Sequence, residues 1–104
     1  MRQDTILQAH ARRSPEKAAV VIGGRRVSYG ELYRRARALA LGMRQHGAAP
    51  GQRVLIYLPN GIEFVQAVFA AFAVGAVVVP VNTRMTAQEL EYFIDDSLPV
   101  LVLF

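Results

Sequence analysis

Apolar residues change their spacing several times along the chain, and each change indicates a new element. The first segment, residues 4–12, predicts a short helix that ends before a Ser-Pro pair, because the residue before proline is disfavoured in helical conformation. Two apolar runs, 18–22 and 25–28, then flank Gly23 and Gly24. Paired glycines supply the positive φ angles of a two-residue turn, so these runs predict a β-hairpin.

A helical pattern follows the hairpin. Ser28 stands three residues before Glu31, which is the spacing of a capping box at the start of a helix. The apolar residues beyond it recur on one helical face: Leu32, Ala36, Leu39, Ala40 and Met43. Gly47 is typical of the residue just past a helix end. We therefore expect an amphipathic helix from Ser28 to Gly47.

The next segment poses a choice between a membrane span and a buried core. Residues 53–58 predict a buried strand, and the stretch 64–81 then contains a single polar side chain, Gln66. A membrane helix needs about twenty continuous apolar residues. This stretch instead changes at Gly75 from alanine-rich to valine-rich, which predicts a helix over 61–74, capped by Asn60, and a strand over 76–80. No membrane span is expected.

The alternation of predicted strands and helices continues to the last residue. Thr86 and Glu89 form a second capping box before a predicted helix over 87–96, and residues 100–104 predict another strand. Alternating strands and helices with short connections are typical of βαβ units. The fold class expected is therefore α/β: an incomplete parallel βαβ sheet with a preceding β-hairpin and helix. Because the last strand is apolar and has no partner beyond it, we expect residues 1–104 to be a truncated part of a larger domain.

Composition and charge narrow the function classes. The chain has 104 residues, of which 53% are hydrophobic and 19% charged, and it has no cysteine, so disulfides and thiolate metal sites are excluded. The formal net charge is +4, but the arginines are dispersed along the chain without a nucleic-acid motif, and we expect solvated faces rather than nucleic-acid binding. The first residues lack the apolar segment of a secretory signal, which favours a cytoplasmic location.

Three stretches in order resemble the N-terminal part of the adenylate-forming enzymes, the family that includes acyl-CoA synthetases, aryl-CoA ligases, luciferases and peptide-synthetase adenylation domains. The stretches are RVSYGELYRRARALA (26–40) and, within residues 51–97, the G-A-x-x-V-P segment beginning at Gly75 and the N-x-R segment of Asn82 and Arg84. The T-A-x-E-L that follows resembles the acyl-CoA synthetase branch. Residues 1–104 are thus expected to be the truncated N-terminal portion of an AMP-binding domain.

The resemblance implies a carboxylate ligase that uses ATP, Mg²⁺ and CoA when full length. Its phosphate loop, its segments for AMP and Mg²⁺ and its catalytic lysine belong to later parts of the family's sequence, and the one lysine here, Lys17, precedes the hairpin. No phosphate-binding glycine motif is present. We therefore expect no catalytic residue and no cofactor bound by this fragment alone, and we leave open whether the chain is itself an enzyme.

Asn82, Thr83 and Arg84 are the candidate cofactor-binding residues. They follow a predicted strand, and ligands of open α/β sheets collect beyond the carboxyl ends of strands, where an arginine can face a phosphate. The alternative is that the loop only caps the helix that begins after Thr86. No metal site is expected, since His10 and His46 lie far apart and the neighbours Asp95 and Asp96 point about 100° apart on a helix.

Two functions remain open from the sequence. The chain is either the N-terminal fragment of an ATP-dependent acyl-CoA ligase, inactive by itself, or a stand-alone α/β interaction module derived from that family. In the first case its partner is the remainder of the enzyme chain; in either case the exposed sheet favours self-association.

Overall fold

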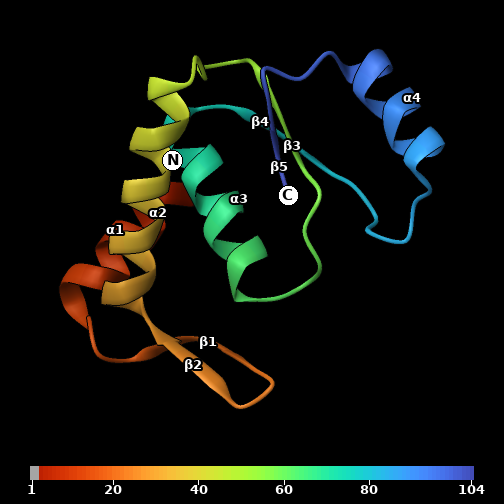
Figure 1. The fold of residues 1–104 in the computed structure, drawn as a ribbon. Helices are drawn as coiled ribbons and strands as arrows, with labels where there is room; N and C mark the ends of the chain where they lie inside the picture. The colour runs from red at the N-terminus through yellow and green to blue at the C-terminus, as the bar shows by residue number, and fades with distance from the viewer. Residues whose placement is uncertain (1–2) are drawn as a thin grey trace.

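The computed structural model describes residues 3–104 and contains helices and strands in the order that the sequence predicts (Figure 1). The elements are α1 Gln3–Arg13, β1 Ala18–Ile22, β2 Arg25–Ser28, α2 Tyr29–Gln45, β3 Arg53–Ile56, α3 Ile62–Val74, β4 Val77–Pro80, α4 Ala87–Ser97 and β5 Leu101–Leu103.

The hairpin and the start of α2 form as predicted. β1 pairs with β2 in antiparallel register, with Ile22 opposite Arg25, and the turn glycines have φ angles of 56° at Gly23 and 81° at Gly24. At the start of α2 the hydroxyl of Ser28 accepts a hydrogen bond of 3.2 Å from the backbone N–H of Glu31. That bond satisfies one of the N–H groups that the first helical turn leaves without a partner.

The second sheet is parallel and has the strand order β4-β3-β5. Leu55 in the central strand lies opposite Val79 of β4 and Val102 of β5. Side chains of β3 alternate between the two faces, yet Val54, Leu55 and Ile56 are all fully buried. The expected α/β class with an incomplete parallel sheet is confirmed.

The apolar stretch divides at Gly75, as predicted. α3 ends at Val74, and Gly75 adopts a left-handed conformation with φ 83° before β4 begins at Val77. The backbone C=O of Gly75 accepts a hydrogen bond of 2.9 Å from Gly51 N–H. Glycine is the residue that enters this conformation without a steric penalty, so the turn separates two elements that otherwise form one apolar run.

Some predicted boundaries and one cap are wrong. The N-cap of α3 is Gly61, not Asn60. Because glycine has no side chain, the first turn of α3 has no side-chain cap. The predicted strands 53–58, 76–80 and 100–104 are shorter in the structure, since ladder pairing extends over only three or four residues.

Helices α1, α2 and α3 pack together, and α4 lies on the far side of the strands from them (Figure 1). One core cluster joins α2 and α3 to β3, through residues such as Met43, Ala70 and Ile56. The other joins the hairpin to α1, α2 and α3. In contrast, α4 has no buried residue over its whole range, 87–97.

Apolar side chains remain exposed around β4, α4 and the last strand. Val77 is 49% exposed, Tyr92 68% and Phe104 89%. The valine strand β4 is therefore not covered on both faces by residues 3–104, although its composition is typical of a buried strand. Within that same range, no helix has both the length and the apolar composition needed to cross a bilayer.

Candidate functional site

A hollow of about 510 Å³ opens at the carboxyl ends of β3 and β4. It is lined by the segment after β3, by the first turn of α3 and by the loop after β4; all three sequence-predicted residues, Asn82, Thr83 and Arg84, line it. The βαβ topology brings these segments together, because parallel strands deliver their carboxyl ends to one edge of the sheet.

Hydrogen bonds from the strand β3 side hold the loop in place. The backbone N–H of Val81 donates to Ile56 C=O at 3.0 Å, which continues the parallel pairing past Pro80. The Tyr57 hydroxyl donates to the C=O of Thr83 at 3.1 Å. These bonds connect residues far apart in the sequence, so the loop has a defined position relative to the sheet.

Within the loop, Asn82 has a structural role. Its Oδ1 accepts a hydrogen bond of 2.8 Å from Arg84 N–H, and its C=O accepts one of 3.1 Å from Met85 N–H. This is the local side-chain turn that Asn forms readily. Thr86 then caps α4, because its hydroxyl accepts a hydrogen bond of 3.2 Å from Glu89 N–H. The local turn and the helix cap therefore account for the hydrogen bonds of Asn82 and Thr86 in this loop.

Arg84 is the residue that capping does not explain. Its side chain is exposed at the hollow and makes no hydrogen bond or ion pair with any residue in the range 6–104. A guanidinium in that position can donate to the oxygens of a phosphate or a carboxylate. The hollow therefore offers an anion contact beside the apolar ring of Phe64, but it contains no nucleophile paired with a base.

The sequence pattern does not identify two residues that line this hollow, Asn60 and Phe64. It also does not identify Tyr57, which lies outside the lining and anchors the loop through its hydroxyl. The signal for Tyr57 is a hydroxyl at the carboxyl end of an otherwise apolar strand, where a buried Tyr usually finds a hydrogen-bond partner.

The remaining candidate residues make local contacts. The ring of His10 stacks on Tyr29 with 4.9 Å between centroids, and His46 Nδ1 lies 2.9 Å from Gly42 C=O at the end of α2. Asp95 and Asp96 are exposed on α4. Among the side chains of residues 6–104, no three His, Asp or Glu are grouped in a way that would hold a metal ion.

One carboxylate near the hollow has a shifted pKa. Glu63, in the first turn of α3, accepts a hydrogen bond of 2.9 Å from Arg25 Nη1. That hydrogen bond, followed by smaller contributions from the backbone and from nearby charge, lowers the pKa of Glu63 below its ordinary value of 4.5. The pair connects the hairpin turn to α3 and therefore has a positioning role.

Comparison with known proteins shows that the chain is similar to one enzyme family and to CoA ligases. The family model described as AMP-binding enzyme matches residues 7–104. The chain is 42% identical over 83 residues to 3-oxocholest-4-en-26-oate–CoA ligase of Rhodococcus rhodochrous, covering 80% of this chain and 15% of the relative. It is 42% identical over 87 residues to feruloyl-CoA synthase of an Amycolatopsis species, covering 84% of this chain and 18% of the relative.

A solved structure resembles the whole fold. The N-terminal domain of FACL13 from Mycobacterium tuberculosis superposes with a TM-score of 0.90 at 32% sequence identity, covering 98% of this chain and 26% of that chain. The chain thus spans less than a fifth of the two curated relatives and about a quarter of the structural one.

Proposed function

The chain belongs to the AMP-binding enzyme family, and from that premise we propose that it forms the N-terminal part of an ATP-dependent acyl-CoA ligase. The proposed enzyme transfers the AMP portion of ATP to a carboxylic acid, which forms an acyl-adenylate and releases pyrophosphate. CoA then takes the acyl group and AMP leaves. The observation that carries the proposal is the family match over 7–104, together with 42% identity to two CoA ligases.

The exposed apolar surface supports the fragment interpretation. The apolar strand β4 and the aromatic side chains of the amphipathic helix α4 are left open by the other residues, with Val77 49% and Tyr92 68% exposed. Large exposed apolar patches on a monomer usually mark an interface. We propose that the remainder of the enzyme chain covers this surface.

The residues of this chain fit only part of the cofactor set. Bound ATP supplies the adenylyl group, and Arg84, with the amide and hydroxyl of Asn82 and Thr83, fits a phosphate of a nucleotide cofactor at the edge of the hollow. The acidic ligand group that Mg²⁺ prefers is not formed by the side chains of residues 6–104. We therefore assign this chain a role in shaping one wall of the site, and no step of the reaction.

The proposal predicts that residues 1–104 alone do not catalyse ATP–pyrophosphate exchange with any carboxylic acid. The first check is to read the coding sequence beyond Phe104 for an in-frame Gly-rich Ser/Thr loop with a lysine. The second is the exchange assay on the isolated chain against a heat-killed control. Exchange above that control would overturn the inactivity of the fragment.

The role of Arg84 is tested by substituting this residue in the complete polypeptide that the gene encodes and measuring the ligase kinetics. Arg84→Gln should raise KM for ATP or for CoA, because it removes a charged contact to a phosphate, while Arg26→Gln on the exposed hairpin should leave both values unchanged. Equal kinetics for the two variants would assign Arg84 no ligand contact and leave the loop with its capping role alone.

A stand-alone interaction module is the second candidate, favoured by the same open sheet edge and unburied α4. A natural stop codon after Phe104 with unrelated sequence beyond it would favour this function over the ligase. In either case we propose a cytoplasmic location.

A further inference from the structure

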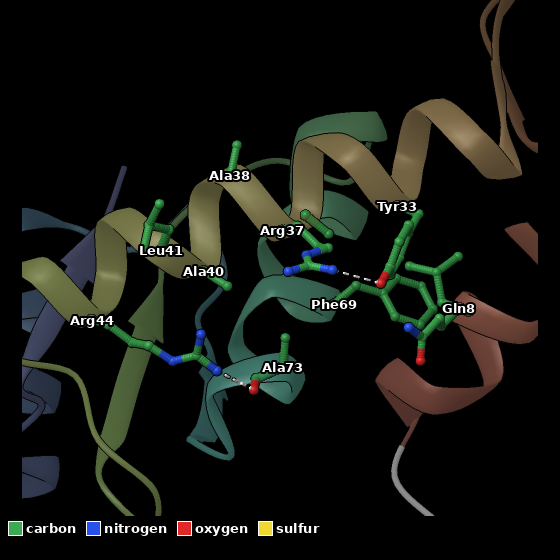
Figure 2. A pocket seen from close by; sticks show the side chains of 11 residues that line it. Gln8, Tyr33, Arg37, Ala38, Ala40, Leu41, Arg44, Phe69 and Ala73 are labelled. Atoms are coloured by element: carbon green, nitrogen blue, oxygen red, sulfur yellow. Dashed lines mark hydrogen bonds between the residues drawn. The ribbon is translucent and has the colours of Figure 1, made fainter.

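A second cavity, of about 430 Å³, lies between α1, α2 and α3 (Figure 2). It shares no lining residue with the hollow at the sheet edge. This volume lies in the range of small-molecule pockets, roughly 300–1,000 Å³.

Apolar side chains form the inner part of the cavity. Leu7 of α1 and Ala36 and Ala40 of α2 are buried, and Phe69 and Ala73 of α3 are partly buried. The alanine side chains are small and so leave space between the facing helices unfilled at this point. A ligand here removes apolar surface from water, so its body must itself be apolar.

Polar groups gather at one end of the cavity. The hydroxyl of Tyr33 lies beside the guanidinium of Arg37, and Gln8 of α1 also lines this end of the cavity (Figure 2). Arg37 Nη1 donates to the Tyr33 hydroxyl at 3.1 Å, and its Cζ is 5.6 Å from the centroid of the Tyr33 ring. These contacts hold the guanidinium beside the cavity, and among residues 6–104 no further group accepts a hydrogen bond from its other N–H groups.

Arg44 has a different role at the other end. Its Nη2 donates to the C=O of Ala73 at 2.9 Å, which joins α2 to the last turn of α3 (Figure 2). Arg44 thus closes one end of the cavity, and Arg37 faces the space that a ligand would occupy. A ligand that matches this arrangement has one anionic end, not two.

The charge around the cavity favours an anion. No Asp or Glu among residues 6–104 lines it, and Arg34 and Arg35 lie on the same helix as Arg37. The nearest acidic residue of α2, Glu31, is paired with Arg35. A single carboxylate has two oxygens that suit one guanidinium with a neighbouring hydroxyl.

We propose that this three-helix cavity binds a free monocarboxylic acid with an apolar body, carboxylate against Arg37 and body against Phe69 and Ala73. The site is separate from the hollow of Asn82, Thr83 and Arg84, and binding there requires no ligase activity. The charge complementarity and the apolar interior select this ligand class over a neutral lipid or a free phosphate.

The test is photolabelling of the polypeptide as its gene encodes it, with a ten-carbon carboxylic acid that carries a diazirine in its chain. Mass spectrometry maps the label. We expect labelled peptides from α1, α2 or α3, with octanoate as a competitor and with 1-octanol and acetate competing at least tenfold less well. Loss of a charged hydrogen bond predicts labelling about tenfold weaker in Arg37→Gln.

Matched variants separate binding from folding. Arg34→Gln removes the same charge from the same helix outside the cavity and should keep normal labelling. Ala73→Leu fills the cavity while Arg37 stays, and should also reduce labelling; circular dichroism checks that each variant folds. Equal labelling of Arg37→Gln and Arg34→Gln, equal competition by 1-octanol, or absence of label from these helices would overturn the proposal.

Discussion

Replacing Gly75 by alanine tests whether the left-handed turn between α3 and β4 controls this fold. Gly75 has φ 83°, and a non-glycine residue in that conformation costs about 1–2 kcal/mol. A Cβ there would lie 3.4 Å from Pro50 Cβ, which is contact without severe overlap, so conformation is the main cost. We expect Gly75→Ala to lower the free energy of unfolding by about 1–2 kcal/mol.

Gly42 provides a matched control with the opposite sign. It lies inside α2, and a Cβ added there meets nothing within 4 Å. Alanine in a helix interior is favoured over glycine by roughly 0.5–1 kcal/mol, so Gly42→Ala should stabilise the protein. The two single alanine substitutions should therefore differ by about 2 kcal/mol.

The measurement is urea unfolding followed by far-UV circular dichroism, on the polypeptide as its gene encodes it, with light scattering to exclude association. The midpoint and slope give each free energy of unfolding. If Gly75→Ala is as stable as Gly42→Ala, the reasoning from the φ angle is refuted, and the division of the apolar stretch must depend on something else.

Three further predictions concern a cap, an ion pair and association. Ser28→Ala should lower the free energy of unfolding by about 1 kcal/mol, measured by the same urea titration, because α2 loses its N-terminal cap; no change would mean that solvent replaces the cap fully. The stability from the Arg25 contact to Glu63 should be present above pH 4.5 and lost as the pH falls through the lowered pKa of Glu63, since protonation removes the charge. An NMR titration checks this: Arg25→Gln should move the pKa back toward 4.5, and an unchanged pKa would contradict the assigned cause. Residues 1–104 alone should associate at micromolar concentration through their exposed apolar surface, as seen by size-exclusion chromatography with light scattering, whereas a monodisperse monomer with a cooperative melt would favour the stand-alone module.

Local signals made most of the fold predictable. The Gly23–Gly24 turn, the caps at Ser28 and Thr86 and the break at Gly75 each depend on a backbone or hydrogen-bond preference of one or two residues. Such preferences act within a few residues along the chain, so they are visible without the tertiary structure. The prediction that Asn60 caps α3 is wrong because the helix begins one residue later than expected, at Ile62, so that Gly61 occupies the N-cap position.

The candidate site was predictable only in part. The position of Asn82, Thr83 and Arg84 after a strand predicts that they lie at a ligand-binding edge, and the structure places them around one hollow. The contact from Tyr57 to Thr83 spans 26 residues, and no local pattern encodes a pairing at that distance. The two roles within the loop, a turn held by Asn82 and a guanidinium of Arg84 that bonds to no residue in 6–104, are also decided by the tertiary structure.

The sequence by itself determined the order of elements, the α/β class and the resemblance to the adenylate-forming enzymes, because periodicity, turn residues and motifs are properties of consecutive residues. The tertiary structure decided which strand is central, with β3 between β4 and β5, and which helices share a core. It also decided that Arg37 faces a cavity while Arg44 bridges two helices, although both occupy the polar side of the same helix. The physical reason is that strand order and side-chain partners depend on contacts between distant segments, and these arise only when the chain packs.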